Sequence, residues 1–90
     1  MRDRYKILDK EGVYFITSTI VEWLPVFTSK VYFDILIDSM KYCIQEKALN
    51  LYAYVILEDH FHLIVSAMNL SETISSLKKF TARKIILLLR

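Results

Sequence analysis

The sequence predicts an α+β fold in which a small antiparallel sheet is covered by helices. The chain has 90 residues, of which 54% are hydrophobic, so it forms one small domain with a core and is not a disordered segment. A single glycine and a single proline leave little turn chemistry for a many-stranded sandwich or barrel. Segments of strand character and segments of helical spacing alternate along the chain, which indicates few hairpins and long helices.

The first predicted strand covers residues 13–20 (VYFITSTI), which are β-branched and aromatic, with Thr17 and Thr19 on one face. A loop follows around residues 23–25, where Trp23 and Phe27 either stack on bases or cover the end of the core. The first helix is predicted from a cap at residue 28 or 29 to about residue 49. Its apolar residues at roughly helical spacing are Val31, Ile35, Ile37, Met40, Ile44 and Leu49.

Two further strands are predicted at residues 51–57 and 60–67, and only Glu58 and Asp59 separate them. This break predicts an antiparallel hairpin, although Glu-Asp is a poorer tight-turn pair than Asn-Gly. A last helix begins at residues 71–72. Its expected stripe is Ile74, Leu77, Thr81, Ile85 and Leu88.

The predicted order of strand, helix, strand, strand, helix is a ferredoxin-like βαββα(β) arrangement whose final strand is missing. Residues 85–89 (IILLL) are apolar around more of the helix than one buried stripe needs. We therefore expect either a homodimer through this C-terminal helix or a truncated chain. Residues 1–12 are read as a charged N-terminal segment, and residues 13–90 as the domain.

The single Cys43 excludes an internal disulfide framework and favours a reducing, cytoplasmic compartment. No signal peptide or membrane span is recognised, so no membrane partner is expected. Basic residues concentrate in the last segment: from residue 69 onward the chain has five basic side chains and one acidic one. Four of them, Lys78, Lys79, Arg83 and Lys84, lie on adjacent turns and either contact nucleic-acid phosphates or form an ordinary solvated face.

Both histidines of the chain lie in one tripeptide, His60-Phe61-His62. On a strand, residues i and i+2 share a face at about 6–7 Å, so both imidazoles can reach one metal ion. Two neutral imidazoles make half of a divalent-metal site and leave positions for a carboxylate and for substrate oxygens. The alternative is a pair of structural, hydrogen-bonded histidines on a half-exposed strand.

Three segments resemble HUH-type tyrosine transposases of single-strand insertion sequences, including the REP-associated tyrosine transposases. The segment LYAYVILEDHFHLIVSA is similar to the strand, turn and His-hydrophobe-His motif of that family. YFITSTIVEWLPVF resembles its first strand and the following loop, and SSLKKFTARKI resembles the helix after the motif. The resemblance spans roughly residues 13–86.

The resemblance implies metal-dependent cleavage and transfer of single-stranded or hairpin DNA. His60 and His62 would hold Mg²⁺ or Mn²⁺, and a tyrosine would attack the scissile phosphate to leave a 5′-phosphotyrosine. It also implies that Lys78 matches a lysine of the family's helix. No nucleotide cofactor is required by this chemistry.

The chain departs from the family at two points. The nucleophilic tyrosine of the family lies downstream of the motif, but all six tyrosines here precede it, and Tyr14, Tyr52 and Tyr54 are interpreted as packing residues. Glu58-Asp59 stands where the family has Pro-Asn, and either carboxylate is a candidate third ligand or a solvent-facing acid. Three functions stay open: an incomplete transposase, an inactive DNA- or metal-binding remnant, and an unrelated ferredoxin-like interaction domain.

Overall fold

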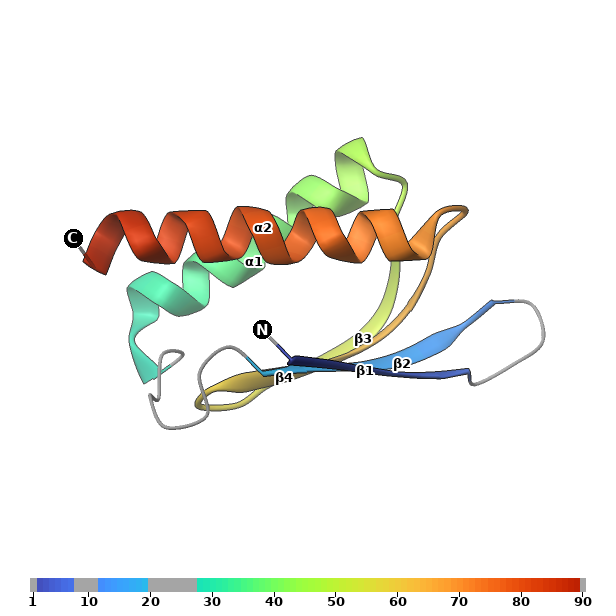
Figure 1. Cartoon of the computed structure of the whole chain (residues 1–90), viewed down its shortest axis with the longest axis horizontal. Helices are drawn as coiled ribbons and strands as arrows, with labels where there is room; N and C mark the ends of the chain where they lie inside the picture. Colours follow the sequence, from blue (N-terminus) through green and yellow to red (C-terminus); the bar gives the residue numbers. More distant parts are fainter. Residues whose placement is uncertain (1, 8–11, 20–27, 90) are drawn as a thin grey trace.

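The computed structural model describes residues 2–7, 12–19 and 28–89, and it contains six regular elements (Figure 1). All five predicted elements are present with bounds within about three residues, while the loop predicted around Trp23 and Phe27 lies outside the described residues. The elements in chain order are β1 (Arg2–Ile7), β2 (Tyr14–Thr19), α1 (Lys30–Glu46), β3 (Asn50–Ile56), β4 (His60–Ser66) and α2 (Leu70–Leu89).

The four strands form one antiparallel sheet in the order β1-β2-β4-β3. Both helices lie on the same side of this sheet and cross each other above it (Figure 1). The other side, which we call the open face, has no helix over it. The α+β class is therefore confirmed, and the arrangement is compatible with a ferredoxin-like type.

Strand β1 was not predicted, because its charged residues led us to assign residues 1–12 to a charged segment without regular structure. It pairs with the whole length of β2, from Arg2 opposite Thr19 to Ile7 opposite Tyr14. Charged residues are common on edge strands, where they discourage pairing with other chains. Strand β4 already has β3 and β2 as its neighbours, so β1 pairs at the edge of the sheet beside β2. In a ferredoxin-like arrangement the final strand would pair at this edge.

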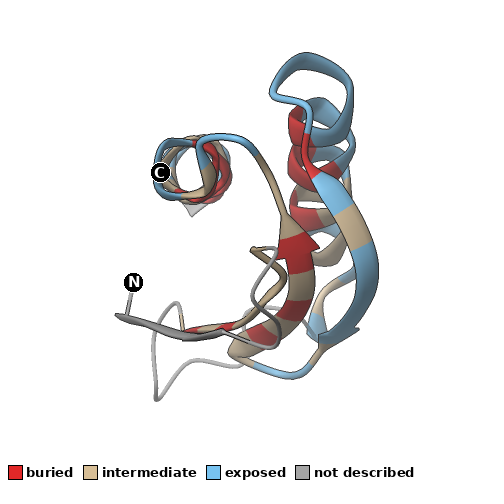
Figure 2. Cartoon of the chain, turned by 90° about the vertical axis from the view of Figure 1, so that its right-hand side faces the viewer, coloured by how far each residue is buried: buried red, intermediate tan, exposed pale blue. Residues whose placement is uncertain are grey.

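The core lies between the sheet and the helices, and strand β4 supplies its centre. Phe61, Leu63 and Val65 are almost completely buried, whereas the residues between them are partly exposed. Buried positions on both helices face this row (Figure 2). The strictly alternating burial of β4 confirms the two-residue period expected of a strand with one covered face.

The buried stripe of α1 matches the predicted one only in part: Met40 is buried, and Ile35 and Ile37 pack against the core, as predicted. It consists of Leu36, Ser39, Met40 and Cys43, whereas Val31 and Ile44 are 54% and 42% exposed. Apolar residues surround much of this helix, so its sequence did not determine which side would meet the sheet and α2. Burial also raises the pKa of the Cys43 thiol, which keeps it in the neutral form.

On α2 the predicted stripe is correct except at its end. Ile74, Leu77, Thr81 and Ile85 are buried, but Leu88 is 53% exposed. Within residues 85–88 only Ile85 is buried, so the apolar run does exceed one stripe; the homodimer inferred from it stays a prediction. Neither described helix has the length and apolar character needed to cross a membrane.

Helix α1 ends at Glu46, three residues earlier than predicted, because the backbone turns sharply at Ala48. Ala48 has φ 53°, in the left-handed region that glycine prefers. The turn lets Leu49 enter the core, where it is 2% exposed, while its N–H donates to the Cys43 carbonyl at 3.1 Å. At the other end Ser29 is the N-cap residue, as expected, but its hydroxyl makes no capping hydrogen bond.

Replacing Ala48 by glycine should therefore stabilise the protein. The left-handed conformation is strained for alanine, and relief of that strain exceeds the extra chain entropy of glycine, for a net gain of about 0.5–1 kcal/mol. Urea unfolding followed by circular dichroism measures the change. The control is Ala82→Gly inside α2, which should cost about 1 kcal/mol; a destabilised Ala48→Gly variant would contradict the proposed strain.

Candidate metal centre on the open face of the sheet

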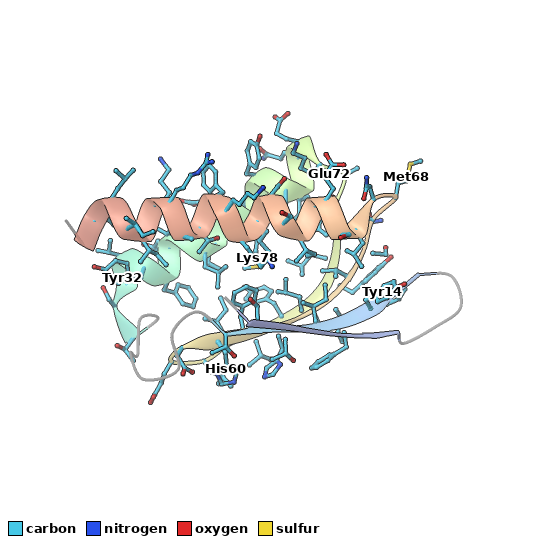
Figure 3. The ribbon with its side chains drawn as sticks, in the orientation of Figure 1. Tyr14, Tyr32, His60, Met68, Glu72 and Lys78 are labelled. Carbon is cyan, nitrogen blue, oxygen red and sulfur yellow. The ribbon has the colours of Figure 1, made fainter. Side chains whose placement is uncertain are left out.

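The two histidines project from β4 onto the open face, away from both helices. Their neighbours in the strand, Phe61 and Leu63, point into the core, so the alternation of the strand leaves the imidazoles on the other side. Figure 3 shows His60 on the side of the sheet opposite the helices. The side chain of His60 is 31% exposed and therefore accessible from solvent. The predicted sharing of one face by His60 and His62 is confirmed.

Each imidazole is oriented by a hydrogen bond at the same ring atom. The Nδ1 of His60 lies 2.8 Å from Oδ1 of Asp59, and the Nδ1 of His62 lies 2.9 Å from Oγ1 of Thr17 on β2. The register of the sheet produces the second contact, because Thr17 is directly opposite His62. Both Nε2 atoms are thus the nitrogens left for another partner.

The Asp59 contact also determines a protonation pattern. A carboxylate accepts hydrogen bonds, so the Nδ1–H of His60 donates to Asp59, and in the neutral ring Nε2 carries the lone pair. The hydroxyl of Thr17 accepts from His62 Nδ1–H in the matching tautomer. This is the pattern found around metal-binding histidines, whose second ring nitrogen is engaged by a carboxylate, carbonyl or hydroxyl.

The spacing of the rings fits a shared metal ion. The centroids of His60 and His62 are 5.1 Å apart, with the planes at 87°. Two imidazoles bound through nitrogen at about 2.1 Å and at neighbouring coordination positions have centroids roughly 4.5–5.5 Å apart. Phe15 stacks on His62 at 5.4 Å and limits its movement. The separation of the two rings is therefore compatible with half of a divalent-metal site.

A third protein ligand is not found in the part of the chain that the structure describes. No group of three or more histidine, cysteine, aspartate or glutamate side chains there is placed to hold a metal ion. Of the two candidate carboxylates, Glu58 is exposed at the hairpin tip, and Asp59 bonds to His60. The arrangement offers two nitrogen ligands with their supporting groups and open positions for water or substrate oxygens.

Among the described side chains, the hydroxyl of Tyr52 is held away from the histidine pair. Tyr52 donates to or accepts from Ser66 at 3.0 Å, and Ser66 lies about 13 Å from His62 along β4. The prediction that Tyr52 and Tyr54 pack in the core is wrong, since they are 60% and 50% exposed. They lie on the edge strand β3, which the helices cover incompletely. Tyr14 does pack against the core, as predicted.

The predicted basic residues of α2 lie on the helical side of the molecule and not with the histidines. Lys79, Arg83 and Lys84 are exposed there, and they line one groove with residues of α1. Lys78 lies on the side of α2 that faces the sheet (Figure 3) and is only partly exposed. The sequence placed the four on adjacent turns correctly, but it did not show that the sheet separates them from the histidine pair.

Two residues of the site were not singled out from the sequence. Phe15 precedes the buried Ile16 in β2 and lies on the open face, as the alternation of side chains along a strand predicts. Its contact with His62 forms only when β2 and β4 are in register. Thr17 was placed on a face with Thr19, but its contact with His62 depends on the same register. No protein-family model, curated protein or solved structure matches the chain; the resemblance to the transposases stays a prediction.

The first test of the site is the tautomer of His60. If Asp59 accepts from Nδ1–H, neutral His60 should be predominantly the Nδ1–H form, which long-range ¹H–¹⁵N NMR spectra of the imidazoles distinguish directly. Asp59→Ala should shift His60 toward the Nε2–H form that free histidine prefers. Glu58→Ala removes the adjacent exposed carboxylate and should leave the tautomer unchanged; equal effects of both variants would rule out the specific contact.

Proposed function

We propose that this chain is the metal- and DNA-binding part of an HUH-type tyrosine transposase, which cleaves and transfers single-stranded or hairpin DNA through a 5′-phosphotyrosine. One observation carries the proposal: both histidines of a His-Phe-His motif stand on an accessible sheet face with Nδ1 engaged and Nε2 left for a metal. A merely structural pair does not need the Nδ1 atoms of both rings to be engaged within the protein, as they are here by Asp59 and Thr17.

The arrangement of elements supports a ferredoxin-like fold for this function. Strands β2, β3 and β4 with helices α1 and α2 follow the βαββα order, with both helices on one side of the sheet. Strand β1 takes the edge where the fold's last strand would pair. In this proposal the covered face supplies the core and the open face supplies the chemistry.

His60 and His62 would hold Mg²⁺ or Mn²⁺ through Nε2. The metal, when bound, would polarise the scissile phosphate and offset the charge that develops on its oxygens. Asp59 and Thr17 would hold the two rings in orientation for the metal. Phe15 keeps the His62 ring against the sheet.

The edge strand β1 is rich in basic residues. Its backbone register places Arg2, Arg4 and Lys6 opposite Thr19, Thr17 and Phe15 of β2. This strand lies two strands away from the histidine-bearing β4, and in this proposal its basic residues contribute to neutralising the phosphates of a bound DNA strand. No tyrosine follows His62 in the sequence, so the attacking phenol is proposed to come from outside these 90 residues.

A second candidate function is a DNA- or metal-binding module without cleavage activity. The observation that favours it is the position of Tyr52, whose hydroxyl contacts Ser66 and not the histidine pair, together with the absence of any tyrosine after His62 in the sequence. A metal-binding module of this kind would use His60 and His62 as the transposase would, and it would differ from it only in the covalent step.

Metal binding tests what the two candidates share. Mn²⁺ titrated into the protein, followed by calorimetry and by paramagnetic broadening in NMR spectra, should bind near the pair, and His62→Ala should abolish binding. Thr17→Val should weaken it roughly tenfold, as loss of a supporting hydrogen bond typically does. Thr19→Val, opposite His60 on the same face, is the matched control and should change little. Binding that survives His62→Ala would leave the histidines with a structural role.

Incubation with Mn²⁺ and a labelled single-stranded oligonucleotide containing a hairpin tests the covalent step. We expect no covalent protein–DNA adduct from this chain alone on a denaturing gel, because the phenol is not at the site. An adduct that one tyrosine-to-phenylalanine change abolishes, such as Tyr52→Phe, would show instead that the chain contains its own nucleophile.

A further inference from the structure

A groove between the two helices lies on the side of the molecule away from the histidines. It has a volume of about 420 Å³, and its walls come from the last turns of α1 and the middle of α2. Pockets of roughly 300–1,000 Å³ are the usual size for small-molecule and nucleotide sites. We call this feature the interhelical groove.

Four cations surround the groove, and no acidic residue lines it. They are Lys47 of the α1 end and Lys79, Arg83 and Lys84 of α2. Within the described part of the chain, none of the four makes an ion pair. Unneutralised positive charge gathered around a concave surface attracts an anion of matching size.

The wall of the groove is aromatic. Tyr42 of α1 and Phe80 of α2 stack with centroids 5.4 Å apart and planes within 7° of parallel. The Nζ of Lys84 lies 5.5 Å from the centre of the Phe80 ring, a cation–π distance. Tyr42 keeps 40% of its surface exposed, so the stack is accessible to a further planar ring.

An aromatic stack edged by lysine and arginine is the combination that binds nucleotides without regard to sequence. Bases stack on aromatic rings, and the phosphates contact the cations. A bare phosphate would use only the cations, and an acidic peptide would leave the aromatic wall without a planar partner. From the aromatic wall, the four cations and the volume, we propose that the interhelical groove binds a nucleotide unit.

This site is independent of the metal centre. The groove lies on the solvent side of the helices, whereas His60 and His62 lie on the opposite side of the sheet. A nucleic-acid chain held in the groove would therefore be a second contact of the protein. Because the groove residues include no candidate metal ligand, binding there needs no metal ion.

The test is fluorescence anisotropy with labelled dT12 in EDTA, which removes any contribution of the metal centre. The strand should bind, with an affinity that falls with salt at a slope of about −2 to −3, as expected for four phosphate contacts by single-stranded DNA. Arg83→Ala should lower the affinity and reduce the slope by about 0.7. Lys41→Ala, an exposed cation of α1 outside the groove, should lower it less.

The base contact has its own variant and probe. Tyr42→Leu, which removes the exposed ring of the stack, should weaken dT12 binding roughly 5- to 100-fold, the loss typical of one stacked base. It should leave unchanged the binding of an abasic 12-mer with the same number of phosphates. Tyr54→Leu, an exposed aromatic on β3, is the matched control. Circular dichroism melting of each variant separates loss of binding from loss of folding.

Competition identifies the source of the nucleotide unit. Displacement of dT12 by dTMP would assign the groove to free nucleotides, and displacement only by oligonucleotides would assign it to nucleic acid. Equal binding of the abasic 12-mer or of polyglutamate, or unchanged binding by Arg83→Ala and Tyr42→Leu, would overturn the proposal. His62→Ala should not affect dT12 binding in EDTA, so failure here and failure of the metal centre are distinguishable.

Discussion

The alternation of side chains between the two faces of strand β4 is the constraint on which the rest of the structure depends. β4 is a central strand with neighbours on both sides, so its backbone hydrogen bonds are made within the sheet. Phe61, Leu63 and Val65 must then all point to one face, where the helices remove them from water. The same geometry forces His60 and His62 to the other face. A shift of register by one residue would bury both imidazoles and expose the core row.

The two proposed sites follow from the two sides that this constraint creates. The covered face brings α1 and α2 together, and their solvent side forms the interhelical groove. The open face keeps the histidines accessible and lets β2 supply their supporting contact through Thr17. A nucleic acid bound on both sides would have to pass around the edge of the sheet. The two contacts share no residues, so each would contribute separately to the binding free energy.

The fold orients the two imidazoles of the candidate metal centre through one hydrogen bond to each ring. Asp59 comes from the hairpin tip next to His60, and Thr17 comes from a strand 45 residues earlier. The first contact is local, because consecutive residues leave the turn together. The second requires β2 and β4 to be paired, so the complete pair of supporting bonds forms only in the folded sheet.

Features with a local period were predictable from the sequence. The strand at residues 60–67, the common face of its two histidines and the helix after it depend on two- and 3.6-residue spacing, and the structure has them within a few residues. Strand β1 was missed because its charges are typical of a solvated segment, and only pairing with β2 reveals it as an edge strand. The buried side of α1 was predicted only in part: Met40 is buried as expected, but Val31 and Ile44 are exposed, since apolar residues on several sides give no single preferred stripe.

What the sequence by itself determined is the shared face of the histidine pair, the candidate metal ligands: two histidines separated by one apolar residue share a face on any strand. What only the tertiary structure decided is their surroundings, which include Thr17, Phe15 and the separation from the basic residues of α2. It also decided that Tyr42 and Lys47 of α1 join Lys79, Phe80, Arg83 and Lys84 in one groove. The physical reason is that strand register and helix docking depend on contacts distant in sequence, whereas side-chain alternation depends only on the local backbone.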